Sequence, residues 1–308
     1  MKTKLMMMAA IAAVGMTIVS CSSDNENFVE NVKPGKAHVR LVCGMGVSVS
    51  PMTRAALTAN GKALTDLYIL DYDKATGKLL QVLHQTNTAA DFAEPDLTLD
   101  YGEHVLKVVA TRSTEPTLWD AGNNTWQVEP NILTPVTSTQ PVMLTSTKTS
   151  DTFGAEKEVS VGIGTATTVS IALDRLVAKL VINSTDVFPD DCTTITLDLQ
   201  EYSTLSWTTM DVTEAVNNQR IADVTNLRGT TGTVFSYFVL APKDGYQTDI
   251  TLTTNRTDGN PYSTITVPGV MLERNKATTI TGPIYGHSQG FQVTVNDALD
   301  SEGHDINI

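Results

Sequence analysis

Residues 37–49 read AHVRLVCGMGVSV, and their apolar side chains fall on alternate positions. The residues between them are nearly all small or polar. A period of two is typical of a β-strand with one buried face. At about 3.3 Å per residue the stretch spans roughly 43 Å, well beyond the usual strand of about five or six residues. We therefore predict a long first strand with one apolar face. The larger side chains of that face are Val39, Leu41, Met45, Val47 and Val49.

The sequence upstream of this strand is typical of a lipoprotein export signal. A basic start is followed by an apolar stretch over residues 5–19, which is short for a membrane span. The stretch ends in Ile18-Val19-Ser20-Cys21, which resembles a bacterial lipobox whose cysteine thiol carries the lipid. No aspartate follows Cys21 directly, and this resembles sorting to the outer membrane. We expect a signal peptide over 1–20 and a polar tether over 21–36. An ordinary secretory signal with a chance cysteine is the alternative.

The composition favours an all-β protein with a substantial core. Threonine and valine are abundant, helix-period stretches are few, and 41% of the 308 residues are hydrophobic. The chain has 21 Lys and Arg against 34 Asp and Glu, a net charge of −13. This argues against a nucleic-acid partner, because phosphates require a basic face. No Lys or Arg follows Lys276, so the end of the sequence is purely acidic.

Short apolar segments separated by turn signals continue along the whole chain. Such spacing is typical of β-sandwich domains. We expect an N-terminal domain over 37–173 and a C-terminal domain over 174–308. Tight turns are predicted at 74–77 and 257–261. The expected strands cover residues 67–72, 78–84, 97–110, 159–163, 169–173, 174–182, 195–199, 234–240, 250–254, 262–267, 275–281 and 291–299.

Two cysteines remain once Cys21 carries a lipid. Cys43 and Cys192 could pair in an exported protein, but both lie in strand-like apolar runs. Two buried free thiols fit that placement equally well. A bridge would also prevent release of the first strand, and we therefore predict no disulfide.

No pattern for catalysis, a cofactor or a metal is present in the sequence. Asp71, Asp73 and Gly77 resemble part of a calcium loop, but the third ligand and the glycine at fixed spacing are missing, so a hairpin turn is favoured. The histidines show no metal-ligand spacing and the serines no nucleophile elbow. Trp119 and Trp126 could stack on sugar rings, although loop tryptophans more often cover the edge of a core. A glycan-binding surface lipoprotein therefore stays an alternative function.

Four features in sequence order resemble the fimbrillins of Bacteroidia, the subunits of type V pili. The lipobox precedes the long strand, and that strand is followed by Met52-Thr53-Arg54-Ala55. A central Arg175-Leu176-Val177-Ala178-Lys179-Leu180 opens the second half. Leu272-Glu273-Arg274-Asn275-Lys276 and Thr279-Ile280-Thr281-Gly282-Pro283 lie near the end. The resemblance covers nearly the whole chain after the signal.

The resemblance implies two tandem transthyretin-like β-sandwich domains and assembly by strand exchange. A surface protease would cut between Arg54 and Ala55, removing the lipid and the first strand, residues 37–50. A donor strand from another pilin subunit would then fill the vacant groove, in a homopolymer or a heteropolymer. The candidate donor is the tail over 290–308. Its donor residues are Phe291, Val293, Val295 and Leu299.

Several roles within a fimbria are compatible with these features. The donor tail is shorter than the strand it would replace, and its end is acidic and rich in Gly and Asp. The tail could equally be the last strand of its own domain. An anchor subunit would keep the Cys21 lipid and stay uncut at Arg54. Stalk, tip and anchor roles therefore remain open, with localisation at the outer membrane, the cell surface or the fimbrium.

Overall fold

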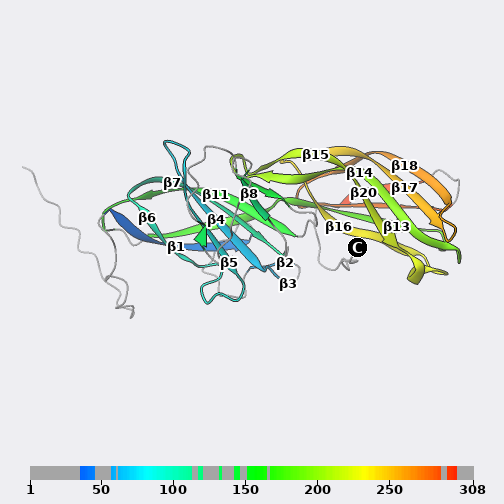
Figure 1. Cartoon of the computed structure of the whole chain (residues 1–308), viewed down its shortest axis with the longest axis horizontal. Coiled ribbons are helices and arrows are strands. Elements are labelled where there is room, and N and C mark those ends of the chain that lie inside the picture. Colours follow the sequence, from blue (N-terminus) through cyan, green and yellow to red (C-terminus); the bar gives the residue numbers. More distant parts are fainter. Residues whose placement is uncertain are drawn as a thin grey trace, which may run out of the picture.

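The computed structural model describes residues 35–45, 57–59, 62–112, 117–120, 132–133, 142–145, 151–164, 167–285 and 290–296. Within these ranges the regular structure is β-strand, apart from one short 3₁₀ turn, η1 (Thr225–Leu227). The strands form two lobes that lie end to end along the long axis (Figure 1). The all-β prediction is confirmed.

The first lobe is a folded sheet that encloses its own core. Its strand order is β6-β1-β12-β11-β7-β4-β5-β9. β12 pairs with β1 along most of its length and with β11 only at Asp174 and Arg175, so the sheet folds over there. Both resulting layers contribute side chains to one apolar core. The bounds are β1 (Lys36–Met45), β4 (Asp66–Asp73), β5 (Leu79–Thr86), β6 (Asp96–Asp100), β7 (Gly102–Thr111), β9 (Ile132–Leu133), β11 (Thr152–Val161) and β12 (Thr167–Arg175).

The second lobe is a sandwich of two four-stranded layers. One layer runs β15-β14-β17-β18 and the other β16-β13-β19-β20, joined by a single pairing of Tyr202 with Leu240. Alternate residues of both layers fill a second apolar core. The bounds are β13 (Val177–Ser184), β14 (Cys192–Ser206), β15 (Asp211–Asp223), β16 (Gly232–Leu240), β17 (Tyr246–Arg256), β18 (Pro261–Leu272), β19 (Ala277–Gly282) and β20 (Gln292–Asn296).

Four short strands complete the described part of the fold. β2 (Thr58–Ala59) pairs with β3 (Lys62–Ala63) in a separate hairpin. β8 (Thr117–Asp120) pairs with β10 (Val142–Thr145), and β10 also pairs with β14 of the second lobe. The loop-rich stretch of the first half therefore contributes strands to the second sheet. The division of the chain into domains at residue 174 stays a prediction.

The turn after β4 is built by Asp73 and Gly77. Asp73 Oδ1 accepts hydrogen bonds from the backbone N and the Oγ1 of Thr76, at 2.7 and 2.6 Å. These bonds hold the pKa of the Asp73 carboxyl below its usual value. Gly77 has a φ of 67°, which favours glycine. The hairpin predicted here is confirmed, and so is the second turn, which joins β17 to β18.

The two lobes share a third apolar core that the sequence did not predict. Tyr68, Leu70 and Val109 lie on the outer face of the first lobe's sheet. They pack against Trp207 and Phe238 of the second lobe. Because β4 is buried on both faces, its apolar run is continuous rather than alternating.

A buried ionic cluster lies beside this third core. The Asp151 side chain is fully buried and accepts hydrogen bonds from Arg112 at 3.0 Å and from Arg175 at 2.7 Å. Arg175 Nη1 also donates to Asn275 Oδ1 at 2.7 Å, which links the two lobes. Asn275 takes a φ of 58°, and its backbone N donates to the Val177 carbonyl at 2.9 Å. Two of the sequence motifs quoted above therefore meet at the junction between the lobes.

The two cysteines belong to different cores. Cys43 lies in the first core and Cys192 in the second, and both are buried free thiols, as predicted. Burial raises the pKa of the Cys43 thiol far above its ordinary value. The thiol is therefore unreactive while β1 stays in place.

Candidate functional site

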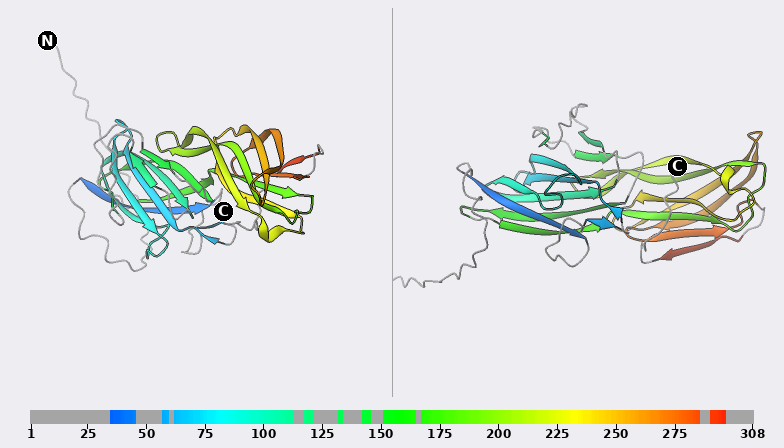
Figure 2. Two further views of the ribbon diagram at one scale, coloured as in Figure 1. Left: turned by 45° about the vertical axis from the view of Figure 1, so that its right-hand side comes forward. Right: turned by 90° about the horizontal axis from the view of Figure 1, so that it is seen from below.

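The candidate site is the place that β1 occupies in the first lobe, which we call the β1 slot. β1 pairs in parallel with β12, from Val39–Thr167 to Met45–Leu173. On its other side, β1 pairs antiparallel with β6, from Lys36–Asp100 to Arg40–Asp96. Figure 2 shows β1 as the blue strand along one side of the first lobe. The strand therefore lies one position in from the edge, with hydrogen bonds on both sides.

The hydrogen bonding of β1 extends beyond the end of β6. The backbone N of Leu41 donates to the Pro95 carbonyl at 3.0 Å, and that of Cys43 donates to the Ala93 carbonyl at 2.9 Å. Ala93 has a φ of 75°, so the loop bends sharply there while it follows β1. The segment before β6 thus forms part of the slot wall.

One face of β1 supplies the first core. Ala37, Val39, Leu41 and Cys43 are 6%, 0%, 0% and 1% exposed and pack within the core of the first lobe. Leu97, Leu99, Val169 and Ile171 lie beside them on the neighbouring strands, as their register positions require. Met45 packs against the same core but is only partly buried. The alternation read from the sequence therefore describes the inner face of this strand.

The opposite face of β1 changes character along the strand. Lys36 and His38 are half-buried and Arg40 is exposed, but Val42 and Gly44 are buried. The one-faced strand expected from the sequence is therefore found over 36–41, and the end of β1 is buried on both faces. Val42 is the one aliphatic residue among the even positions of this stretch, and the surrounding chain buries it.

Two ion pairs lie along the rim of the slot. Arg40 Nη2 lies 2.5 Å from Glu94 Oε2, and Lys36 Nζ lies 2.8 Å from Asp100 Oδ1. In both pairs the cation belongs to β1 and the anion to the wall that stays behind. Exposed pairs of this kind contribute about 0–1 kcal/mol each. They therefore contribute more to the selectivity of strand binding than to its affinity.

Several predicted site residues lie outside the described part of the chain. Lipidation and cleavage therefore stay predictions, and so does a role for the predicted tryptophans, since the side chain of Trp119 is also not described. The residues concerned are Cys21, Val47, Val49, Arg54, Ala55, Trp126 and Leu299.

The candidate donor tail begins as an edge strand of the second lobe. β20 pairs antiparallel with β19, and all five of its residues are exposed, including Val293 and Val295. Phe291 just before it packs against the second core. A Cβ built on Gly282 would lie 2.5 Å from the Phe291 ring, so this glycine makes room for the aromatic side chain. The structure thus places β20 on its own lobe, far along the chain axis from β1 (Figure 2).

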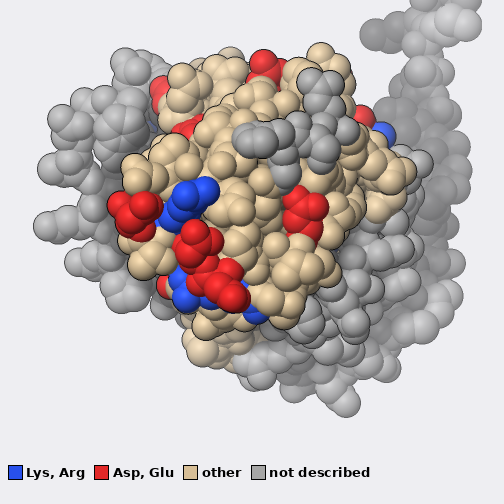
Figure 3. Space-filling view, turned by 90° about the vertical axis from the view of Figure 1, so that its right-hand side faces the viewer, with Lys and Arg blue, Asp and Glu red and all other residues tan. Residues whose placement is uncertain are grey.

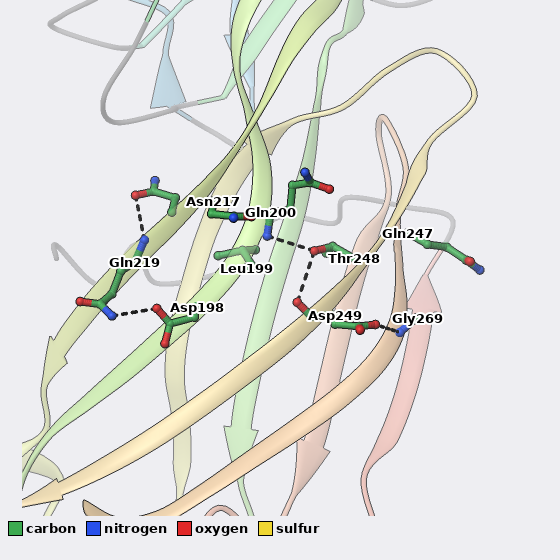
Figure 4. Close-up of a pocket in the computed structure, with 10 residues that line it drawn as sticks. Asp198, Leu199, Gln200, Asn217, Gln219, Gln247, Thr248, Asp249 and Gly269 are labelled. Carbon is green, nitrogen blue, oxygen red and sulfur yellow. Dashed lines mark hydrogen bonds between the residues drawn. The ribbon is translucent and has the colours of Figure 1, made fainter.

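A second feature is a polar depression of about 700 Å³ on the outer face of the second lobe. Asn217 and Gln219 of β15 lie on one side and Gln247 and Asp249 of β17 on the other, with Gln200 of β14 between them (Figure 4). Gln219 donates to Asp198 at 2.8 Å, and Asp249 accepts from the Gly269 backbone at 2.8 Å. The amides of Gln200, Asn217 and Gln247 form no side-chain hydrogen bond within the described residues. They can therefore donate and accept at the same time.

The described residues contain no group of three or more His, Cys, Asp or Glu side chains that could hold a metal ion. They also contain no helix long and apolar enough to cross a membrane. At the far end of the second lobe, charges of both signs lie side by side and most of the face is uncharged (Figure 3). That face offers no extended basic surface for a polyanion.

No family model and no curated protein matches the sequence significantly, whereas several solved structures share its fold. A candidate polysaccharide-binding protein from Bacteroides thetaiotaomicron superposes with a TM-score of 0.55 over 84% of this chain and 96% of its own, at 12% identity. The fimbrial anchor protein Mfa2 from Porphyromonas gingivalis gives 0.52 over 84% and 97%, at 10% identity. A candidate adhesin from Bacteroides ovatus gives 0.51 over 85% and 93%, at 14% identity. The resemblance to fimbrial proteins is therefore confirmed at the level of the fold.

Proposed function

We propose that this chain is a structural subunit of a type V fimbria that polymerises by β-strand exchange. In this proposal its two lobes are transthyretin-like sandwich domains, and Cys21 carries a lipid to the outer membrane. Proteolysis after Arg54 then frees the segment that contains β1. The observation that carries the proposal is the position of β1, which fills the first core from between β6 and β12.

Loss of β1 would create a strong drive for replacement. The inward-facing side chains of β6 and β12 would lose their cover, and one edge of each strand would lose its hydrogen-bond partners. Burial of a side chain such as Val39, Leu41 or Val42 stabilises by about 1.5–3 kcal/mol. Addition of a strand from another chain restores both contributions. Head-to-tail contacts of this kind do not close on themselves, so they produce filaments.

Cleavage after Arg54 is expected to make the β1 slot exchangeable. The whole chain is cut with an arginine-specific protease, and the protease is then inhibited. An excess of a fluorescent peptide with the sequence of residues 35–50, which itself contains Arg40, is added afterwards. We expect a fluorescent complex that resists SDS, and alkylation of Cys43 in the displaced fragment. The variant Arg54→Gln should capture no peptide.

A matched variant separates cleavage at this position from general proteolysis. Arg54→Lys should stay uncut by the arginine-specific protease but capture the peptide after a lysine-specific protease. Capture by uncut protein, or cleavage without any capture, would contradict strand exchange at this slot.

An anchor role differs from a stalk role in one measurable property. An anchor keeps β1 and the lipid on Cys21, and the fold shared with the anchor protein Mfa2 makes this a concrete alternative. N-terminal sequencing and mass analysis of surface-extracted protein distinguish the two roles. A chain that begins at Ala55 supports a stalk or tip subunit, whereas a lipidated Cys21 supports an anchor.

Glycan binding is the second candidate function, and the polar depression favours it. Planar amides beside carboxylates match neighbouring sugar hydroxyls, which both donate and accept. We expect the double variant Gln200→Ala, Asn217→Ala to weaken retention on a neutral glycan array by about tenfold, since each lost hydrogen bond contributes about 0.5–1.5 kcal/mol. Thr264→Ala on the neighbouring strand is the control and should change nothing. Absence of retention by the unaltered chain would remove this function.

A further inference from the structure

The side chains of β1 define what a replacement strand must carry, and this inference rests on the proposed strand exchange. Four consecutive inward positions, Ala37, Val39, Leu41 and Cys43, are at least 94% buried. An ionised group at any of them would be buried in an apolar core without a partner, which strongly disfavours binding. An occupant therefore needs at least four apolar residues in succession at alternate positions.

The tail of this chain does not meet that requirement. The odd positions after Phe291 hold Val293, Val295, Asp297 and Leu299, so Asp297 interrupts the apolar series. The even positions are mostly polar and hold Gln292, Thr294, Asn296, Ala298 and Asp300. Neither set of alternate residues contains four apolar side chains in succession. The tail therefore cannot fill the slot, whether it binds parallel or antiparallel to β1's own direction.

Phe291 already packs against the core of its own lobe. Its ring packs against the second core in the space left by Gly282. Use of Phe291 as a donor residue would empty that space and remove its contacts with the second core. Without Phe291, only Val293 and Val295 precede the acidic interruption.

The rim of the slot adds a charge requirement. When β1 leaves, Lys36 and Arg40 leave with it, and their partners Asp100 and Glu94 stay on the wall. Asp96 lies at the register position opposite Arg40 and adds a third negative charge. A strand that carries cations on its outward face restores both pairs, whereas an acidic strand is repelled. The tail carries no Lys or Arg, because none follows Lys276.

We infer that the β1 slot takes its replacement strand from a different subunit, and not from the tail of a second copy of this chain. The segment that fits is extended, with at least four alternating apolar residues and basic residues on its outward face. The apolar pattern provides affinity, and the basic residues opposite Glu94 and Asp100 provide selectivity. This subunit then joins its neighbour in the filament heterotypically.

A competition experiment on the whole chain, cut after Arg54, tests the inference. The fluorescent 35–50 peptide serves as the reference, and unlabelled peptides with the sequences 35–50 and 288–303 compete for the slot. We expect the tail peptide to compete at least 100-fold more weakly than the reference. A reference peptide with Lys36→Ser and Arg40→Ser should compete about threefold to tenfold more weakly, with the difference lost at high salt.

Two results would overturn the inference. One is competition by the tail peptide within threefold of the reference. The other is an SDS-resistant ladder formed by the cleaved chain alone. Failure of the reference peptide to enter the slot contradicts the proposed function instead, so the two failures are distinguishable.

Discussion

Replacement of Asp151 by alanine is expected to lower the free energy of unfolding by about 3–5 kcal/mol. The carboxylate is fully buried and pairs with Arg112 and Arg175, whose side chains are themselves mostly buried. Its removal leaves two guanidinium groups in a poorly solvated site without the carboxylate that balances their charge. Arg175 also holds Asn275 of the second lobe, so the change loosens the junction between the lobes. Urea unfolding followed by circular dichroism measures the effect.

The matched control for Asp151 is an exposed carboxylate in the same lobe. Glu158 pairs with Lys74 at 2.6 Å, but both side chains are largely in solvent. Glu158→Ala should therefore cost no more than about 1 kcal/mol. Equal effects of the two substitutions would show that burial of the Asp151 cluster does not matter for stability.

Replacement of Trp207 by alanine is expected to cost about 3–5 kcal/mol and to uncouple the two lobes. Trp207 is fully buried in the third core, where it packs with side chains from both lobes. The unaltered chain should unfold in one transition, because this core and the Asp151 cluster join the lobes. The variant should show two transitions in urea and a larger radius of gyration in X-ray scattering.

The indole nitrogen of Trp207 provides the control for this prediction. Trp207 Nε1 is buried without a hydrogen-bond partner among the described residues. Trp207→Phe removes that unsatisfied donor and keeps an aromatic ring, so it should cost no more than about 1.5 kcal/mol. A loss as large as that of Trp207→Ala would contradict the expectation that an aromatic ring at this position is enough to couple the lobes.

The sequence determined the class of the fold and many of its strands. Alternation over 37–45, turn residues at 74–77 and 257–261 and the abundance of valine and threonine are local signals. A strand with one buried face and a tight turn each impose residue types at fixed spacing, so they can be read without knowledge of the rest of the chain. The same alternation identified Val39 and Leu41 as core residues of β1.

The neighbours of β1 and the way the lobes join follow from long-range packing and not from local sequence patterns. The pairing of β1 with β6 and β12, the burial of Val42 and the meeting of Asp151 with Arg175 join residues far apart in the sequence. Trp207 carried no periodic signal, because it follows the end of β14. Local patterns record which face of a strand is apolar. The neighbour that covers that face depends on the packing of the whole chain, which one segment of sequence does not encode.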